Sequence, residues 1–149
     1  MLAALAACGS LPPARERPAV NAAAVDPTTT LAKIAAASTP PGEHSGFRLM
    51  PLGVYSLDAR VQLAQRAQRS LVVQYYQFEN DATGRLLMRA LREAGARGVQ
   101  VRLLVDDLYT VKSQQPLLAL SATPNMEVRL FNPFCCAREQ GQGGASWRR

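Results

Sequence analysis

The feature that most constrains this chain is an alternation of strand-like and helix-like segments between residues 70 and 134. Three stretches rich in β-branched and aromatic residues predict strands: 70–78, 99–105 and 126–131. Apolar residues at helical spacing separate them, from Leu86 to Ala94 in the first gap and with Leu117 and Leu120 in the second. Strands that alternate with helices in this way predict an α/β fold with a mostly parallel sheet and crossover helices.

Capping residues set the expected boundaries of these segments. Asn80 or Asp81 can cap the helix that follows the first strand, and Gly98 can end it at the C′ position. An earlier helix is expected to start at a Ser56 cap, and residues 47–53 are expected to form an edge strand because Pro51 cannot donate a ladder hydrogen bond. Val99 to Val105 carries one charge, so both faces of that strand are expected to be covered.

Four polar or aromatic residues are the candidates for lining a pocket. Asp106 and Asp107 stand where the second strand should end, and open parallel sheets bind ligands outside the carboxyl ends of their strands. The pair could line a pocket, hold Mg²⁺ or order a loop as a cap; no further carboxylates stand at a metal-site spacing, which favours the cap. Tyr75 and Tyr76 point to opposite faces of their strand, so at most one faces a pocket.

The charge pattern argues against a specific nucleic-acid partner. The formal charge is +6, but the 15 arginines and two lysines are scattered singly rather than clustered into a patch. The single histidine, His44, has no catalytic pattern around it and is interpreted as a solvated loop residue. Cys135 and Cys136 have no zinc-site spacing, so no metal or cofactor is expected.

The N-terminus predicts a membrane anchor rather than a membrane span. Residues 1–8 form a short apolar run ending in Leu5-Ala6-Ala7-Cys8, which resembles a bacterial lipoprotein box with Cys8 as the acylated residue. The other interpretation is a small-residue N-terminus with a chance cysteine. If the box is used, the protein is expected to be a membrane-anchored lipoprotein of the bacterial cell envelope; otherwise it is expected to be membrane-associated. No segment approaches the roughly 20 apolar residues of a transmembrane helix.

A linker is expected between this anchor and the folded domain. Residues 9–44 are rich in proline and alanine and are interpreted as a disordered tether. A short helix is expected within it, starting near Pro27-Thr28 and running through Leu31 and Ala35.

Residues 45–134 carry a resemblance to a known family. The specific pieces are Gln74-Tyr75-Tyr76, the run from Arg97 to Asp107 and the run from Glu127 to Pro133. Together they resemble the first half of a phospholipase D superfamily domain, nearest to bacterial cardiolipin synthases and their lipoprotein-type members. The resemblance implies phosphodiester exchange through a covalent phosphohistidine, with histidine and lysine supplied by two copies of His-x-Lys-x4-Asp and no metal ion. It also implies membrane phospholipids as partners, with the acidic pair near a head-group pocket.

The sequence departs from this family at the catalytic motif. No His-x-Lys occurs anywhere in the chain, and residues 135–149 are glycine-rich and read as a non-family tail. No catalytic residue is therefore carried over. The first hypothesis is an incomplete, inactive phosphatidyltransferase whose partner is the rest of the domain or a second subunit. The alternatives are a non-catalytic membrane-anchored lipoprotein that binds a partner, and a fragment of a nuclease of the same superfamily.

Overall fold

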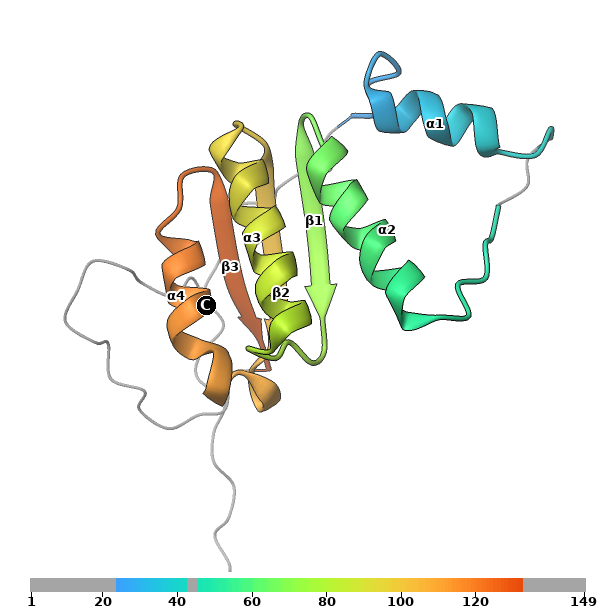
Figure 1. The fold of residues 1–149 in the computed structure, drawn as a ribbon. Coiled ribbons are helices and arrows are strands. Elements are labelled where there is room, and N and C mark those ends of the chain that lie inside the picture. The colour runs from blue at the N-terminus through green and yellow to red at the C-terminus, as the bar shows by residue number, and fades with distance from the viewer. Residues whose placement is uncertain (1–23, 43–45, 133–149) are drawn as a thin grey trace, which may run out of the picture.

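The computed structural model describes residues 24–42 and 46–132 of the 149-residue chain, and these residues form a small α/β unit with one additional helix (Figure 1). The α-helices are α1 (Thr30–Ser38), α2 (Gly53–Arg66), α3 (Ala82–Ala96) and α4 (Gln114–Ser121). The strands are β1 (Ser70–Tyr75), β2 (Gln100–Asp106) and β3 (Met126–Phe131). Two 3-10 turns, η1 (Asp107–Tyr109) and η2 (Val111–Ser113), connect β2 to α4. No helix within the described ranges is long and apolar enough to cross a bilayer.

The three strands form a parallel sheet in the order β1-β2-β3, which confirms the predicted sheet. The register aligns Leu71 with Val101 and Leu103 with Val128, so apolar residues of neighbouring strands share one face. The last predicted strand, 126–131, has the predicted limits, whereas the first ends at Tyr75 instead of continuing to residue 78.

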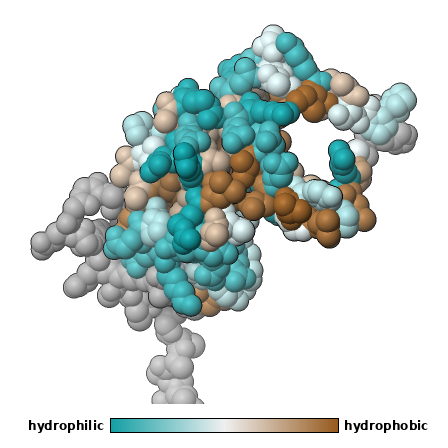
Figure 2. Space-filling view, in the orientation of Figure 1, coloured by the Kyte–Doolittle hydropathy of each residue, from teal (hydrophilic) through white to brown (hydrophobic). Residues whose placement is uncertain are grey.

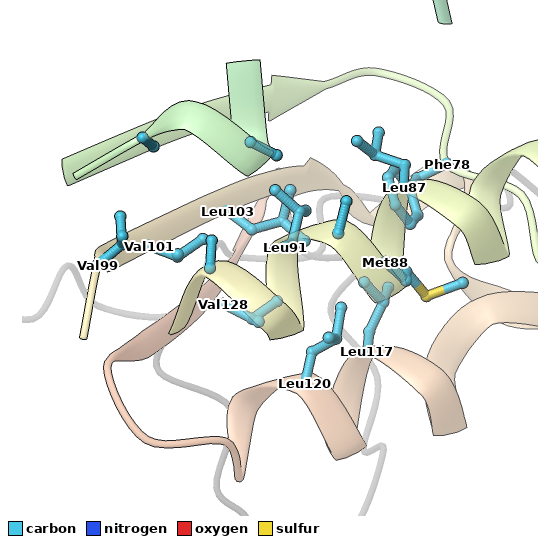
Figure 3. Close-up of a cluster of buried hydrophobic side chains, with 14 of the residues drawn as sticks. Phe78, Leu87, Met88, Leu91, Val99, Val101, Leu103, Leu117, Leu120 and Val128 are labelled. Atoms are coloured by element: carbon cyan, nitrogen blue, oxygen red, sulfur yellow. The ribbon is translucent and has the colours of Figure 1, made fainter. Parts of the chain in front are cut away.

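The helices α2, α3 and α4 pack on the same face of this sheet. Leu91 of α3 and Leu117 of α4 are 1% and 0% exposed, and Figure 3 shows both side chains in one cluster with Leu103 and Val128. Each of these side chains removes enough apolar surface from water to contribute roughly 1.5–3 kcal/mol to folding. The apolar side chains that were predicted to line one side of each helix thus form the hydrophobic core.

Only one face of the sheet is covered by the described elements, which corrects the expectation for β2. Its burial alternates, with Val101, Leu103 and Val105 buried and Arg102 exposed. Both crossover helices lie on the face of the buried residues, so no described element packs on the opposite side. We call that opposite side the open face.

The limits of α3 follow the predicted caps. The Asp81 side chain accepts a hydrogen bond from the Gly84 amide at 2.7 Å, so Asp81 is the N-cap. Gly98 adopts φ +93°, the left-handed conformation that ends a helix without a side-chain penalty. A Cβ at position 84 would lie 1.9 Å from the Glu79 carbonyl oxygen, so only glycine allows this close approach of the chain to the helix.

The start of α2 differs from its prediction. Residues 47–52 form no strand, and the helix begins at Gly53 with Leu52 as an N-cap that makes no side-chain hydrogen bond. The amides of Tyr55 and Ser56 bond to the Leu52 carbonyl, so backbone bonds start the helix three residues before the predicted Ser56 cap. Figure 2 shows hydrophobic residues gathered at this end of α2.

Part of the predicted tether is structured, because α1 lies within it where the short helix was expected. The Thr29 side chain caps α1 by accepting from the Ala32 amide. The segment is held to the domain by an ion pair from Arg69 to Asp26 at 2.8 Å and a hydrogen bond from the Thr30 amide to Gln68 at 2.6 Å.

Candidate functional site

Three side chains lie side by side on the open face at the carboxyl end of the sheet. Tyr75 pairs with Val105 in the register, so the next residues, Tyr76 and Asp106, follow on neighbouring strands and point to the other face. Asp106 in turn pairs with Phe131 of β3. In the order of the strands, Asp106 of β2 therefore lies between Tyr76, which follows β1, and Phe131 of β3, and neighbouring strands are about 4.8 Å apart.

A fourth residue completes this group, because the chain turns back after β2. The Asp106 carboxylate accepts a hydrogen bond from the Leu108 amide at 2.9 Å and thereby caps η1. This turn brings the Tyr109 ring edge-on to the Tyr76 ring, with centroids 5.1 Å apart and an interplanar angle of 72°. We call Tyr76, Asp106, Tyr109 and Phe131 the aromatic cluster.

The aromatic cluster is open to solvent and carries one carboxylate. Tyr76 and Phe131 are 63% and 61% exposed, and Tyr109 is 37% exposed. A side-chain hydrogen bond with Tyr109 raises the pKa of Tyr76, and the charges of Tyr109 and Asp106 raise it further. The Tyr76 phenol therefore stays neutral at physiological pH, beside the acidic side chain of Asp106.

Tyr75 faces the other way and lines a separate cavity of about 620 Å³. This cavity lies between the first turns of α2, the end of β1 and the start of α3. The Tyr75 ring packs edge-on to Phe78 at 5.3 Å, and the Arg60 guanidinium lies 5.8 Å from the Tyr75 centroid. Its other apolar walls include Leu57 and Leu87. An apolar group would fit this cavity, with Arg60 near its rim.

The N-terminus of α3 also borders this cavity, but the Asp81 carboxylate already interacts with the positive end of the helix dipole. Hydrogen bonds from the Gly84 amide and then from the Thr83 side chain hold the pKa of Asp81 below its usual range. Asp81 therefore supplies the negative charge that a helix N-terminus attracts. A phosphate group is not favoured at this position.

Asp107 does not join Asp106 on the open face. It is 5% exposed, and its side chain accepts a hydrogen bond from the Thr110 hydroxyl at 2.7 Å. Both aspartates thus order the turn after β2, which confirms the cap interpretation. No group of three potential metal ligands occurs within residues 24–42 and 46–132.

The structure thus brings together only two of the four predicted pocket residues, Tyr76 and Asp106. Tyr109 and Phe131 were missed by the sequence reasoning, although the alignment of strand ends could have placed Phe131 beside Asp106. Four residues considered earlier lie outside the described residues: Cys8, His44, Cys135 and Cys136.

Comparisons with known proteins show which family this chain is similar to. A sequence profile described as "Cardiolipin synthase, PLD-like domain" matches residues 61–140. Cardiolipin synthase C of Escherichia coli (strain K12) is 51% identical over 82 residues, which are 53% of this chain and 17% of that protein. An uncharacterized protein of Helicobacter pylori (strain J99) is 34% identical over 92 residues, 62% of this chain and 18% of that protein.

The matched part of the chain contains β1, β2 and β3 with α3 and α4, so the similarity covers the whole sheet. The chain spans less than a fifth of the length of these curated relatives. Because the profile matches more than half of the 149 residues, this chain belongs to the family of phospholipase D-like domains of cardiolipin synthases.

Proposed function

We propose that this chain provides part of the scaffold of a phosphatidyltransferase of the cardiolipin synthase type, which exchanges phosphodiesters between membrane phospholipids. The observation that carries this proposal is the 51% identity over 82 residues to Escherichia coli cardiolipin synthase C, together with the match of the cardiolipin synthase profile to the residues that build the sheet. In open parallel sheets, ligands bind beyond the carboxyl ends of the strands. The aromatic cluster and the cavity beside Tyr75 both lie at that end.

A chimera tests whether this chain can replace the corresponding part of an active cardiolipin synthase. The matched segment of cardiolipin synthase C would be replaced by the corresponding segment of this chain, and cardiolipin formation would be measured in cells that lack other cardiolipin synthases. We expect cardiolipin to be formed, because the two proteins are 51% identical over 82 residues and the profile match includes all three strands. A matched chimera with Leu103→Asp, which puts a charge in the core, should form none. A folded, expressed chimera without product would contradict the proposal.

The 149-residue polypeptide by itself is proposed to have no turnover. It contains one histidine, His44, and no His-x-Lys, so it lacks the nucleophile and the lysine that the family chemistry uses. The purified chain incubated with phosphatidylglycerol vesicles should release neither cardiolipin nor phosphatidic acid. Product that depends on this chain would overturn the claim. The missing groups would come from the rest of a phospholipase D-like domain or from a second subunit.

We further propose that Cys8 is acylated and anchors the protein in the bacterial cell envelope. The support is the Leu5-Ala6-Ala7-Cys8 sequence, since an acylated cysteine followed by a proline-rich tether keeps a domain near its lipid substrate. Labelled palmitate should be incorporated into the wild-type chain and not into Cys8→Ser. Cys135→Ser, which retains Cys8, is the matched control and should incorporate label normally.

A non-catalytic lipoprotein that binds a partner is the second candidate. The observation that favours it is the combination of an exposed aromatic cluster with the absence of His-x-Lys from these 149 residues. If the chimera forms no cardiolipin although the aromatic cluster binds a ligand, this second function is preferred.

A further inference from the structure

One edge of the sheet is unpaired along β1. In the order β1-β2-β3, β1 bonds to β2 on one side, and within residues 24–42 and 46–132 no strand pairs with its other side. The backbone N–H and C=O groups on that side, between Ser70 and Tyr75, therefore have no partner strand among the described residues. An unpaired edge of this kind can add a further strand from another segment of polypeptide.

The two outer strands of the sheet differ in how their free edges are protected. β3 carries Glu127 and Arg129, and charged side chains on an outer strand discourage pairing with other chains. β1 has the sequence Ser-Leu-Val-Val-Gln-Tyr, which contains neither a charged residue nor a proline. A short stretch of high β propensity without charge favours the addition of a strand. The edge of β1 is therefore the better candidate of the two.

An apolar groove runs along the same edge, and we call it the edge groove. It has a volume of about 260 Å³ and is lined by consecutive residues of β1 together with residues of α2 and α3. Leu63 of α2, which is 49% exposed, Leu71 and Val73 of β1 and Leu87 of α3 contribute to its apolar lining. Alternate side chains of a strand point to the same face, so an added strand would place every second side chain in the edge groove.

The position of α2 determines what kind of segment fits. α2 lies beyond β1 on the side away from β2, and residues of both elements line the edge groove (Figure 1). Packed helices are about 8–10 Å apart and neighbouring strands about 4.8 Å, so α2 extends past the sheet over the place of an added strand. A second copy that paired its β1 through a two-fold axis would bring its own α2 to the same place. A single extended segment meets no such obstacle.

Arg60 gives the edge groove a positive charge. It is the single charged residue among the described residues that line the groove, and the structure pairs it with no carboxylate in the described part of the chain. Its guanidinium lies 5.8 Å from the ring centroid of Tyr75, the last residue of β1. Glu79 and Asp81, which line the adjoining cavity, accept other hydrogen bonds. A carboxylate on the added segment would therefore complement Arg60.

We propose that the edge of β1 binds an extended segment of a second polypeptide, which adds to the sheet as a further strand beneath α2. The side chains that face the edge groove are apolar, except for one carboxylate that pairs with Arg60 near the end of β1. Backbone hydrogen bonds supply the affinity, and the edge groove with Arg60 selects the sequence. The inference goes beyond the proposed function, because association of polypeptides requires neither lipid nor turnover.

Capped peptides provide the first test. The probe has threonine at the odd positions and valine, leucine and glutamate between them, and its reversed sequence covers the other strand direction. Each labelled peptide is titrated with the full 149-residue chain, and fluorescence anisotropy is measured. We expect binding of the better of the two to weaken roughly fivefold when glutamine replaces the glutamate and more than tenfold when lysine replaces it. Absence of binding, or equal binding of the glutamate and lysine peptides, would overturn the proposal.

Two variants assign the binding to the edge groove. Arg60→Gln should weaken binding of the glutamate peptide roughly fivefold and leave the glutamine peptide unchanged. Leu63→Asp, at a position exposed enough to accept a charge, should weaken binding of both peptides more than tenfold. The matched controls Arg92→Gln and Leu86→Asp change exposed residues of α3 outside the edge groove and should bind as the wild type does. Circular dichroism checks that every variant is folded, and equal losses in the controls would overturn the assignment.

Amide exchange locates the added strand and separates the possible occupants. The probe should slow exchange of the β1 amides that point away from β2 and leave β3 unchanged, whereas protection of β3 alone would overturn the proposal. A peptide that copies residues 133–149 should not displace the probe; displacement would assign the edge to this chain's own segment instead. A dimer in sedimentation experiments that Leu63→Asp dissociates would assign it to a second copy and equally overturn the proposal. A failure here is separate from a failure of the cardiolipin synthase chimera.

Discussion

The two faces of the β-sheet differ in what their side chains do. On the helix-covered face Val101, Leu103 and Val128 are each 1% exposed, and they pack against α3 and α4. On the open face Val72 is 65% exposed, and charged side chains form a network centred on Glu127. The same strands supply both faces, because successive residues point to opposite sides.

This difference separates residues that specify the fold from residues available for function. A core position is filled by whichever apolar side chain packs best, so its identity is explained by its neighbours. Among the residues that the structure describes, no core packing explains Tyr76 and Phe131, which are 63% and 61% exposed on the open face, although Asp106 also caps η1. A side chain that packing does not require is the better candidate for binding.

The largest expected difference between the two faces is in stability. Leu103→Ala removes a buried side chain from the central strand and should lower the free energy of unfolding by about 2–5 kcal/mol. Val72→Ala changes a residue on the open face and should cost less than about 1 kcal/mol. Urea denaturation followed by circular dichroism measures both. Similar costs for the two variants would mean that the open face is covered in solution.

The next largest effect concerns the turn that precedes α3. Gly84→Ala would place a Cβ 1.9 Å from the Glu79 carbonyl oxygen, so the backbone must shift, at a cost of about 1–3 kcal/mol. The matched control is Gly53→Ala at the start of α2, where a Cβ has no neighbour within 4 Å. That control should be neutral or stabilise by up to about 1 kcal/mol. Thermal unfolding compares the two, and equal effects would contradict the close contact.

The sequence predicted the helix-covered face well, because that face follows simple periodic rules. The stripe with Leu91 and the strand 126–131 were located by hydrophobic spacing, and Asp81 and Gly98 by capping preferences. These features are local, so a few neighbouring residues are enough to define them. The family was also identified from local motifs.

The candidate site was predicted only in part, because it depends on contacts between distant segments. Tyr109 reaches Tyr76 through the turn that Asp106 caps, a contact that spans 33 residues of sequence. The predicted edge strand at 47–53 failed for a related reason: a strand forms only with a partner, and within the described residues none pairs with it. The strand propensity of residues 47–53 was therefore not sufficient to predict a strand.

A smaller effect is expected from the charges of the open face. Glu127→Gln removes the anion that lies between Arg102 and Arg129 and should destabilise the protein by up to about 1 kcal/mol. The loss should shrink in 1 M salt, because screening weakens exposed ion pairs. Glu93→Gln, which breaks the pair with Arg89 on the exposed side of α3, is the control and should cost less than Glu127→Gln. A salt-independent loss at Glu127 would indicate packing rather than charge.

The smallest effect is local and concerns the attachment of α1. Hydrogen bonds from the Thr28 side chain and amide, followed by the bond from Arg69, lower the pKa of Asp26 from 3.8 to about 2. Of these bonds, only the one from Arg69 joins this segment to the domain, so its share of the lowered pKa stabilises the attached state above pH 3.8 and is lost as the pH falls toward 2. Amide exchange of residues 30–38 should therefore be faster at pH 2.5 than at pH 5, after correction for intrinsic rates. Asp26→Asn should remove most of this pH dependence while α3 keeps its protection, and an unchanged profile would assign the attachment to Gln68 instead.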